Sequence, residues 1–306
     1  MAMLLKGASV SANIYAESAK KIAELKNAGV MPSLAIVRVG DNPDDVYYEK
    51  MATKKAQEIG VLVSHCTLGL DASQEEIEET ILNINGNPEI HGCLMLRPLP
   101  DGIDEQKICD ILLPEKDIDG IGFVALGNIF MDAEGASENT YAPCTAGACL
   151  KMLEHYDVSV QGKKICVVGR SLVIGKPVAM MLLRQNATVT ICHSRTQDLP
   201  SVVRDADIVI CAIGRAKMFD PSFFSEGQVV LDVGINYHDG KMCGDVNFEE
   251  ALDVLGDAGC ITPVPGGIGS VTTAVLLENL VCAAQAALAK ANVATTPVRA
   301  SEEEQG

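Results

Sequence analysis

The sequence is poor in basic residues. Lys and Arg number 24 against 41 Asp and Glu among 306 residues, which gives a formal net charge of −17. Nucleic acids are bound by Lys and Arg gathered against phosphates, and anionic membrane surfaces attract the same residues. The composition therefore argues against both partners. Part of the acidity lies in residues 295–306, which end in SEEEQG and are predicted to form a disordered, solvated tail.

Metal-ligand and secretion signals are absent as well. The chain has 11 Cys, but no two are spaced as C-x-x-C, and its His residues (5 in all) show no metal-ligand spacing with them. Cysteines in apolar segments, such as Cys93, Cys166, Cys192 and Cys211, are expected to be reduced core thiols, so we predict no metal site and a cytoplasmic location. The apolar part of the N-terminus is too short for a signal peptide, and no segment is expected to be long and apolar enough to cross a bilayer.

What the chain does have is an alternation of apolar, β-rich runs with amphipathic stretches, which is typical of α/β proteins. In the first half, strands are predicted at 33–40, 61–68 and 92–97, and helices at 11–29, 44–60 and 73–86. Residues 97–143 are predicted to be rich in loops. After a helix at 145–157, further strands are predicted at 164–169, 187–192, 207–214, 228–234 and 259–267. These strands are almost continuously apolar, which favours a parallel sheet covered on both faces, and the apolar last helix, 271–291, should be buried.

The segment VVGRSLVIGKP, residues 167–177, predicts a strand, a tight turn and a helix. Gly169 and Gly175 bracket the turn, and Pro177 suits the first turn of a helix. The spacing departs from the common dinucleotide pattern G-x-G-x-x-G. Backbone N–H groups at such a helix N-terminus favour an anionic ligand such as a dinucleotide phosphate, although a turn without a ligand remains an alternative.

The end of the next strand favours NADP over NAD. NAD-binding folds place an Asp or Glu about 20 residues after the glycine turn, to hold the ribose 2′-hydroxyl. Here the strand ends in CHSRT, residues 192–196, without a carboxylate. Ser194 and Arg195 offer a hydroxyl and a guanidinium for a 2′-phosphate, and Arg170 could reach the same group. Solvated loop residues are the alternative interpretation of both arginines.

Eight motifs in order resemble the methylenetetrahydrofolate dehydrogenase/cyclohydrolase (FolD) family over nearly the whole chain. They are VGDNPDDVYYEK (39–50), RPLPDGID (97–104), PEKDIDG (114–120), APCTAG (142–147), VVGRSLVIGKP (167–177), CHSRT (192–196), DVGIN (232–236) and TPVPGGIGSVTTAVLLENLV (262–281). The resemblance implies an α/β fold of two domains: a three-layer α/β folate domain, 1–143, completed by the C-terminal helix 271–291, and a Rossmann-type NADP-binding domain, 144–270. It also implies tetrahydrofolate derivatives as substrates and a cytosolic homodimer formed through the Rossmann domain. Such enzymes oxidise 5,10-methylenetetrahydrofolate to the methenyl cation, and commonly hydrolyse it to 10-formyltetrahydrofolate.

The resemblance also assigns site residues. Tyr48 and Asp119 would be catalytic, since a carboxylate favours the cationic product. The substrate would be bound by Tyr48, Asp119, Leu96, Pro98, Pro100, Pro265, Gly266 and Gly267, with Pro263 also lining the cleft. NADP would contact Gly169, Arg170, Ser171, Ile174, Gly175, Pro177, His193, Ser194, Arg195, Ala212, Ile213, Gly214, Gly234, Ile235, Gly269 and Thr272. Turn formation by Asp117 and Asp119, a core role for Tyr48 and a rigid glycine turn remain the alternatives.

In two places the chain departs from the family pattern. The family lysine four residues after the tyrosine is Ala52 here, and the family glutamine is Leu96, followed by Arg97 in place of leucine. Lys54 would point away from Tyr48, and Lys55 would return to its face about two turns along the helix. We therefore predict an active dehydrogenase with weak or absent cyclohydrolase activity, since hydrolysis needs positioned proton-transfer groups. Replacement of the lysine by Lys54, Lys55 or Arg97 is the alternative.

Two other functions share part of this pattern. A dehydrogenase for small hydroxy or amino acids would have the same Rossmann half, but it would not explain the proline-rich motifs of the first half. A binding protein without catalytic activity is the third possibility, because a fold alone does not establish chemistry.

Overall fold

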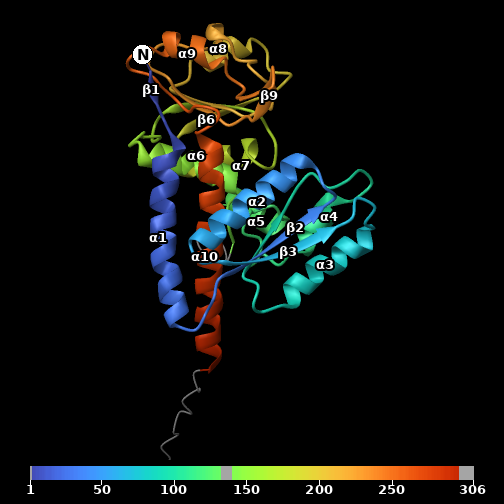
Figure 1. The fold of residues 1–306 in the computed structure, drawn as a ribbon. Helices are drawn as coiled ribbons and strands as arrows, with labels where there is room; N and C mark the ends of the chain where they lie inside the picture. Colours follow the sequence, from blue (N-terminus) through green and yellow to red (C-terminus); the bar gives the residue numbers. More distant parts are fainter. Residues whose placement is uncertain (1, 132–139, 296–306) are drawn as a thin grey trace, which may run out of the picture.

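The computed structural model describes residues 2–131 and 140–295. It consists of two α/β parts, each built on a parallel sheet. Two long helices, α1 (Gly7–Asn27) and α10 (Ile268–Thr295), run side by side and connect the parts (Figure 1). The predicted α/β fold of two domains is confirmed.

The first part contains a sheet of three parallel strands in the order β3-β2-β4. The strands are β2 (Ser33–Val39), β3 (Leu62–Leu68) and β4 (Gly92–Met95), connected by α2 (Pro43–Glu58) and α3 (Gln74–Gly86). The centre of β2 is apolar and completely buried, as expected for a strand covered on both faces. Helix α3 begins with a capping box in which Ser73 and Glu76 each accept the other's backbone N–H.

The second part is a Rossmann-type unit with six parallel strands in the order β1-β11-β8-β7-β5-β6. These strands are β1 (Met3–Leu4), β5 (Lys164–Val168), β6 (Thr188–Cys192), β7 (Ile208–Cys211), β8 (Val229–Asp232) and β11 (Cys260–Ile261). The helices are α6 (Cys144–His155), α7 (Gly175–Arg184), α8 (Leu199–Arg204), α9 (Phe248–Leu255) and the short 3₁₀-helix Pro221–Phe223. A small hairpin, β9 (Asn236–His238) and β10 (Lys241–Cys243), projects beside this sheet.

Several local predictions need correction. The folate domain is predicted to begin at residue 1, but the chain begins in the second sheet, because Met3 and Leu4 pair with β11. The stretch 97–143, predicted to be rich in loops, contains α4 (Glu105–Ile111) and α5 (Phe123–Met131) among its described residues. The strand predicted at 259–267 is only two residues long, since the prolines that follow cannot donate to a sheet. The last helix begins three residues before the predicted 271.

Helix α10 contradicts the expectation that no segment is long and apolar enough to cross a bilayer. Its segment Ile268–Val293 is long and apolar enough, by length and composition, to cross a membrane. However, 56% of its most apolar window is buried inside the fold, and the helix packs against α1 and α6. Val271, Leu276 and Leu280 are completely buried, so the prediction of a buried last helix is confirmed. The tail predicted at 295–306 lies, apart from Thr295, outside the described residues.

All cysteines are free thiols, as predicted, and Cys93, Cys166, Cys192 and Cys211 are buried in the cores. Burial raises the pKa of the Cys93, Cys166 and Cys211 thiols, so these three are neutral and unreactive near pH 7. Within the residues that the structure describes, no group of three or more His, Cys, Asp or Glu could hold a metal ion.

Candidate active site

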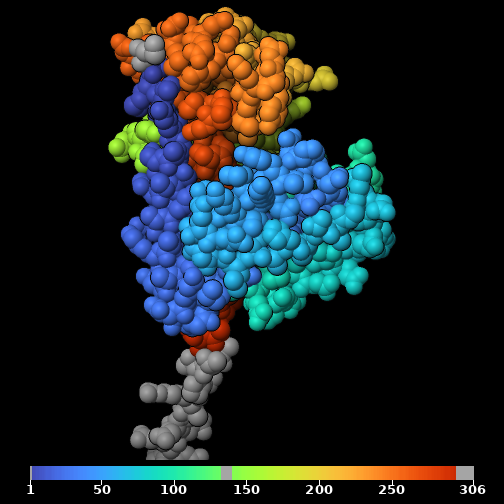
Figure 2. All heavy atoms as spheres, in the orientation of Figure 1, coloured from blue at the N-terminus to red at the C-terminus, as the bar shows by residue number. Residues whose placement is uncertain are grey.

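A cleft of about 600 Å³ lies where the two parts face each other. In Figure 2 the two parts form separate masses, joined along the long helices. The first part contributes Asp44, Asp45, Tyr48, Leu94, Met95, Leu96, Arg97, Pro98, Glu105 and Asp119, together with Thr145 at the start of α6. The opposite side is made by Val173, Val233 and Ile235 of the Rossmann-type unit and by Ile268, Gly269 and Thr272 of α10. The cleft thus brings predicted substrate and cofactor residues to one place.

Tyr48 reaches the cleft from the first turns of α2. The helix begins where the Asn42 side chain accepts the Asp44 N–H at 3.0 Å, and Pro43 follows at a position that tolerates proline. Tyr48 is half-buried and forms a hydrogen bond with the Thr273 hydroxyl of α10. Burial, and then the nearby Asp119, raise the pKa of Tyr48 above its usual value. The phenol is therefore neutral near pH 7 and can donate a hydrogen bond.

Asp119 lies at the N-terminus of α6. Its carboxylate accepts hydrogen bonds from the backbone N–H and the thiol of Cys144. Burial raises the pKa of Asp119, whereas the Arg97 guanidinium and these hydrogen bonds lower it. The residue therefore combines a desolvated carboxylate with groups that favour its charged form. Such a carboxylate can stabilise a positive charge in the cleft.

Two neighbours hold the loop that carries Asp119. Lys116 Nζ donates to the carbonyl oxygens of Ile84 at 2.6 Å, Asn85 at 3.0 Å and Asn87 at 2.6 Å, at the end of α3. Asp117 accepts the N–H groups of Ile121 at 3.0 Å and Gly122 at 2.9 Å. The alternative of turn formation therefore describes Asp117, while Asp119 faces the cleft.

Arg97 is held by Glu105. Its Nη1 lies 3.4 Å from Glu105 Oε1, and Glu105 Oε2 accepts the Leu99 N–H at 2.8 Å. Among the described residues that line the cleft, Arg97 is the only Lys or Arg, whereas four carboxylates line it. The positive charge that enters the cleft therefore comes from the position where the family has leucine.

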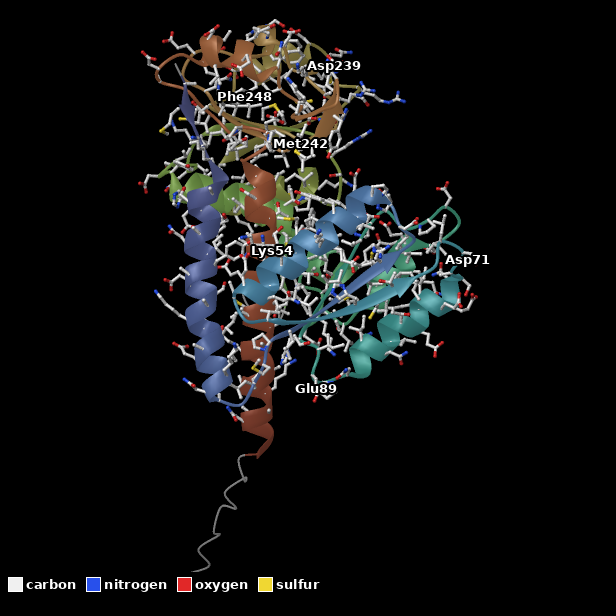
Figure 3. All side chains as sticks on the ribbon, in the orientation of Figure 1. Lys54, Asp71, Glu89, Asp239, Met242 and Phe248 are labelled. Atoms are coloured by element: carbon white, nitrogen blue, oxygen red, sulfur yellow. The ribbon has the colours of Figure 1, made fainter. Side chains whose placement is uncertain are left out.

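The two lysines considered as substitutes lie elsewhere. Lys54 is 4.0 Å from Glu58 and its side chain is 68% exposed. It lies toward the end of α2 that is remote from the Rossmann-type unit (Figure 3). Lys55 forms a 2.8 Å ion pair with Glu58 and lies over the Tyr15 ring. Neither lysine lines the cleft, and Ala52 is completely buried in the core.

The predicted dinucleotide loops meet at the carboxyl ends of parallel strands. Because Val168 of β5 pairs with Cys192 of β6, the loop after Val168 lies beside residues 193–196. The turn is tight, since a Cβ on Gly175 would lie 2.3 Å from the Gly169 carbonyl oxygen. Arg170, Ser194 and Arg195 are exposed at this edge. Two guanidinium groups and a hydroxyl, with no carboxylate in residues 193–196, fit a dinucleotide that carries a 2′-phosphate.

The other predicted cofactor positions occupy neighbouring strand ends. Ser171, Ile174 and Pro177 belong to the first loop and the start of α7, and His193 begins the second loop. Ala212, Ile213 and Gly214 follow β7, while Gly234 and Ile235 follow β8. Of the predicted cofactor residues, Ile235, Gly269 and Thr272 line the cleft itself.

Some predicted substrate residues are not brought to the cleft. Its lining includes Leu96 and Pro98, but not Pro100, Pro263, Pro265, Gly266 or Gly267. The glycines pack against the chain itself: a Cβ on Gly267 would lie 2.6 Å from the Pro263 carbonyl oxygen. Conversely, sequence reasoning did not select Asp44, Asp45, Glu105, Val173 or Val233. For Glu105 a local signal existed, because Asp104 before it accepts the Lys107 N–H and so starts a helix.

The fold and the cleft together define a class. A Rossmann-type unit with a glycine turn at residues 169–175 faces an α/β unit, and the cleft contains a phenol and a desolvated carboxylate. This arrangement is typical of a dinucleotide-dependent enzyme of two domains.

Comparison with known proteins identifies the family. Residues 5–119 match the catalytic domain of tetrahydrofolate dehydrogenase/cyclohydrolase, and residues 143–288 match its NAD(P)-binding domain. The chain is 45% identical over 288 residues to the bifunctional protein FolD of Carboxydothermus hydrogenoformans, covering 93% of this chain and 98% of that protein. The protein therefore belongs to the tetrahydrofolate dehydrogenase/cyclohydrolase family.

Solved structures agree with this assignment. The FolD methylenetetrahydrofolate dehydrogenase/cyclohydrolase of Campylobacter jejuni has a TM-score of 0.89 at 36% identity, covering 94% of this chain and 99% of that one. The Trypanosoma brucei enzyme, complexed with NADP cofactor and an inhibitor, has a TM-score of 0.85 at 30% identity, with 93% and 98% covered.

Proposed function

We propose that this protein is an NADP-dependent 5,10-methylenetetrahydrofolate dehydrogenase with weak or absent cyclohydrolase activity. The observation that carries the proposal is the single cleft in which Tyr48 and Asp119 face Ile235, Gly269 and Thr272. Substrate and cofactor groups are thereby predicted to meet within one site. Family membership and the matched NAD(P)-binding domain support the same chemistry.

The dehydrogenase reaction breaks one C–H bond at the methylene carbon. The hydrogen leaves with its electron pair, and the carbon between the two nitrogens becomes part of a delocalised cation. When bound, the oxidised nicotinamide supplies the acceptor for this hydride. Asp119 stabilises the cation by its negative charge, and Tyr48 holds the substrate as a neutral hydrogen-bond donor. No proton transfer is required, so a held geometry suffices.

The NADP preference is proposed to come from Arg170, Ser194 and Arg195. These side chains are exposed at adjacent strand ends, and a 2′-phosphate would accept charge-assisted hydrogen bonds from both arginines. We further infer a cytoplasmic homodimer formed through the Rossmann-type unit, as the family resemblance implies.

The dehydrogenase can be tested by following NADPH and the methenyl product separately. We expect turnover of methylenetetrahydrofolate with NADP, and none of small hydroxy or amino acids. Asp119→Asn keeps the shape but removes the charge, and should lower kcat about 100-fold. Asp71→Asn is the matched control, because Asp71 is exposed and does not line the cleft. Turnover of the small acids alone, or NADP binding without turnover, would refute the proposal.

The weak cyclohydrolase activity is proposed because two polar groups are missing from the cleft. Ala52 is buried in the core, Leu96 supplies no hydrogen bond from its side chain, and Lys54 and Lys55 are engaged outside the cleft. The addition of water to the methenyl carbon therefore lacks an evident proton acceptor. The relatives described above are named as bifunctional, so the difference would be a property of this chain.

A fully bifunctional enzyme is the second candidate, and Arg97 is the observation that favours it. Arg97 lines the cleft and could position water or substrate in place of the lysine. Methenyltetrahydrofolate is supplied to the purified protein, and its decay is compared with the spontaneous rate. A decay equal to the spontaneous rate is expected. Enzyme-dependent hydrolysis as fast as the dehydrogenase step would refute weak activity, and its loss in Arg97→Gln would identify Arg97 as the substitute.

A further inference from the structure

Two buried carboxylates in the Rossmann-type unit have no place in the chemistry described above. Asp232 ends β8 and is 2% exposed, and Asp245 lies before α9 and is completely buried. Neither lines the cleft. A buried carboxylate is costly unless its oxygens are hydrogen-bonded, so its partners indicate its role.

Asp245 binds the loop that follows β7. Its Oδ2 accepts the N–H groups of Ile213 at 2.7 Å and Gly214 at 3.2 Å, and its Oδ1 accepts that of Arg215 at 2.8 Å. The same Oδ1 accepts Asn236 Nδ2, after β8, at 3.0 Å. One side chain therefore joins the loops at two adjacent strand ends.

Asp232 fixes the backbone of Asp245 in turn. Its Oδ1 accepts the Asp245 N–H at 2.9 Å, and its Oδ2 accepts the Val246 N–H at 3.0 Å. Thr262 completes the connection, since its hydroxyl oxygen accepts the Asp232 N–H at 2.7 Å. The ends of β8 and β11 and the segment before α9 are thus tied together beneath the loops.

Close packing against the two carboxylates explains why this region contains glycines. A Cβ on Gly234 would lie 2.1 Å from Asp245 Oδ1, and a Cβ on Gly244 would lie 1.8 Å from Asp232 Oδ2. Gly234, predicted as a cofactor contact, is therefore required by the carboxylate itself. A Cβ on Gly169 would lie 2.2 Å from the Ala212 carbonyl oxygen, so the loop after β7 also packs directly against the glycine turn at residues 169–175.

We propose that Asp245 is a positioning residue for the dinucleotide, holding the loop 212–215 against Gly169. Three consecutive N–H groups of this loop are used by Asp245. Of its carbonyl oxygens, that of Ala212 lies against Gly169 and that of Arg215 accepts the Met218 N–H at 3.4 Å, which leaves those of Ile213 and Gly214 to face a ligand. The loop is therefore suited to hydrogen-bond donors of the dinucleotide, such as ribose hydroxyls or a carboxamide, and not to its phosphates. The phosphates would depend on the turn at 169–175. The inference rests on the proposed function, because it presumes dinucleotide binding at these loops.

In the test, the purified full chain is titrated with NADPH, and binding is monitored by NADPH fluorescence. The melting temperature is measured in parallel. In Asp245→Asn an amide nitrogen faces backbone N–H donors, so we expect NADPH to bind at least tenfold more weakly. At saturating NADP, the KM for methylenetetrahydrofolate should change less than about twofold. Loss of structure alone would not weaken NADPH binding while leaving this KM nearly unchanged. Asp220→Asn is the control, since Asp220 also accepts a backbone N–H, from Ser222 at 2.8 Å, but is exposed.

The outcomes separate the inference from the proposed function. No binding of NADPH by the unaltered protein would overturn both. Unchanged NADPH affinity in Asp245→Asn, or equal rises in the KM for NADP and the KM for methylenetetrahydrofolate, would overturn the inference alone. If Asp245→Asn does not fold, Asn236→Ala removes only one donor to the carboxylate and should weaken NADPH binding about threefold. Unchanged affinity in that variant would overturn the inference.

Discussion

Replacing Lys116 by Met would test how the Asp119 loop is held in place. The Lys116 ammonium donates to three carbonyl oxygens at the end of α3, at 2.6, 3.0 and 2.6 Å, and the residue is 8% exposed. Methionine keeps the length and the apolar stem but removes all three donors. The carbonyl groups at the helix end, where a positive charge is also favoured by the dipole, would lose their bonds to the ammonium, and those of Ile84 and Asn87 would keep only the backbone N–H groups of Asn87 at 3.3 Å and Ile90 at 3.2 Å.

The magnitude follows from these contacts. A hydrogen bond to a charged group contributes about 1.5–3 kcal/mol, but three bonds share one ammonium whose burial is itself costly. Burial indeed lowers the pKa of Lys116. We therefore expect Lys116→Met to lower the free energy of unfolding by about 3 kcal/mol, well below the sum of three independent bonds. Because Asp119 follows three residues later, kcat of the dehydrogenase should fall as well.

The measurement is urea unfolding followed by circular dichroism, with Lys107→Met as the control. Lys107 Nζ lies 2.6 Å from Glu78 Oε1, but its side chain is 57% exposed. A surface ion pair of this kind contributes about 0–1 kcal/mol. A loss of stability in Lys116→Met no greater than in Lys107→Met would refute the reasoning that the buried ammonium anchors this loop.

Three further predictions concern the Rossmann-type unit. Arg170→Ala should weaken NADP binding roughly tenfold to a hundredfold and leave NAD nearly unaffected, which cofactor titrations can measure; equal losses would show that Arg170 does not contact the 2′-phosphate. Burial raises the pKa of Asp232 to about 7. The folded carboxyl therefore binds its proton more tightly than the unfolded chain does, and the stability it contributes at low pH is lost as the pH rises from about 4 to about 7. Urea unfolding should show Asp232→Asn gaining stability relative to the unaltered protein across that interval, and a difference independent of pH would contradict this. Sedimentation at micromolar concentration should show a dimer; a monomer would reject the proposed assembly.

The sequence predicted the parts of the fold that depend on local pattern. The buried strand β2 is a continuous apolar run, and the turn between Gly169 and Gly175 is specified by its glycines and by Pro177. The parallel second sheet and the buried last helix followed from the same kind of pattern. The motifs around Tyr48 and Asp119 selected two residues that line one cleft.

Features that join distant segments could not be read from local pattern. The strand β1 has only two residues and enters the second sheet by backbone pairing with β11, so no side-chain periodicity announces it. The cleft lining from Val173 and Val233 depends on how the Rossmann-type unit faces the first part.

Charged side chains show most clearly what local sequence determines and what only tertiary packing determines. By its spacing on α2 the sequence by itself placed Lys54 away from Tyr48, and it identified Ala52 and Leu96 as departures from the family. Only the tertiary structure showed that Arg97 enters the cleft beside Glu105, and that Asp245 binds a loop about thirty residues before it in the chain. Helical spacing is set by the backbone within a few residues, whereas the partner of a buried charge is set by packing between segments that the sequence separates.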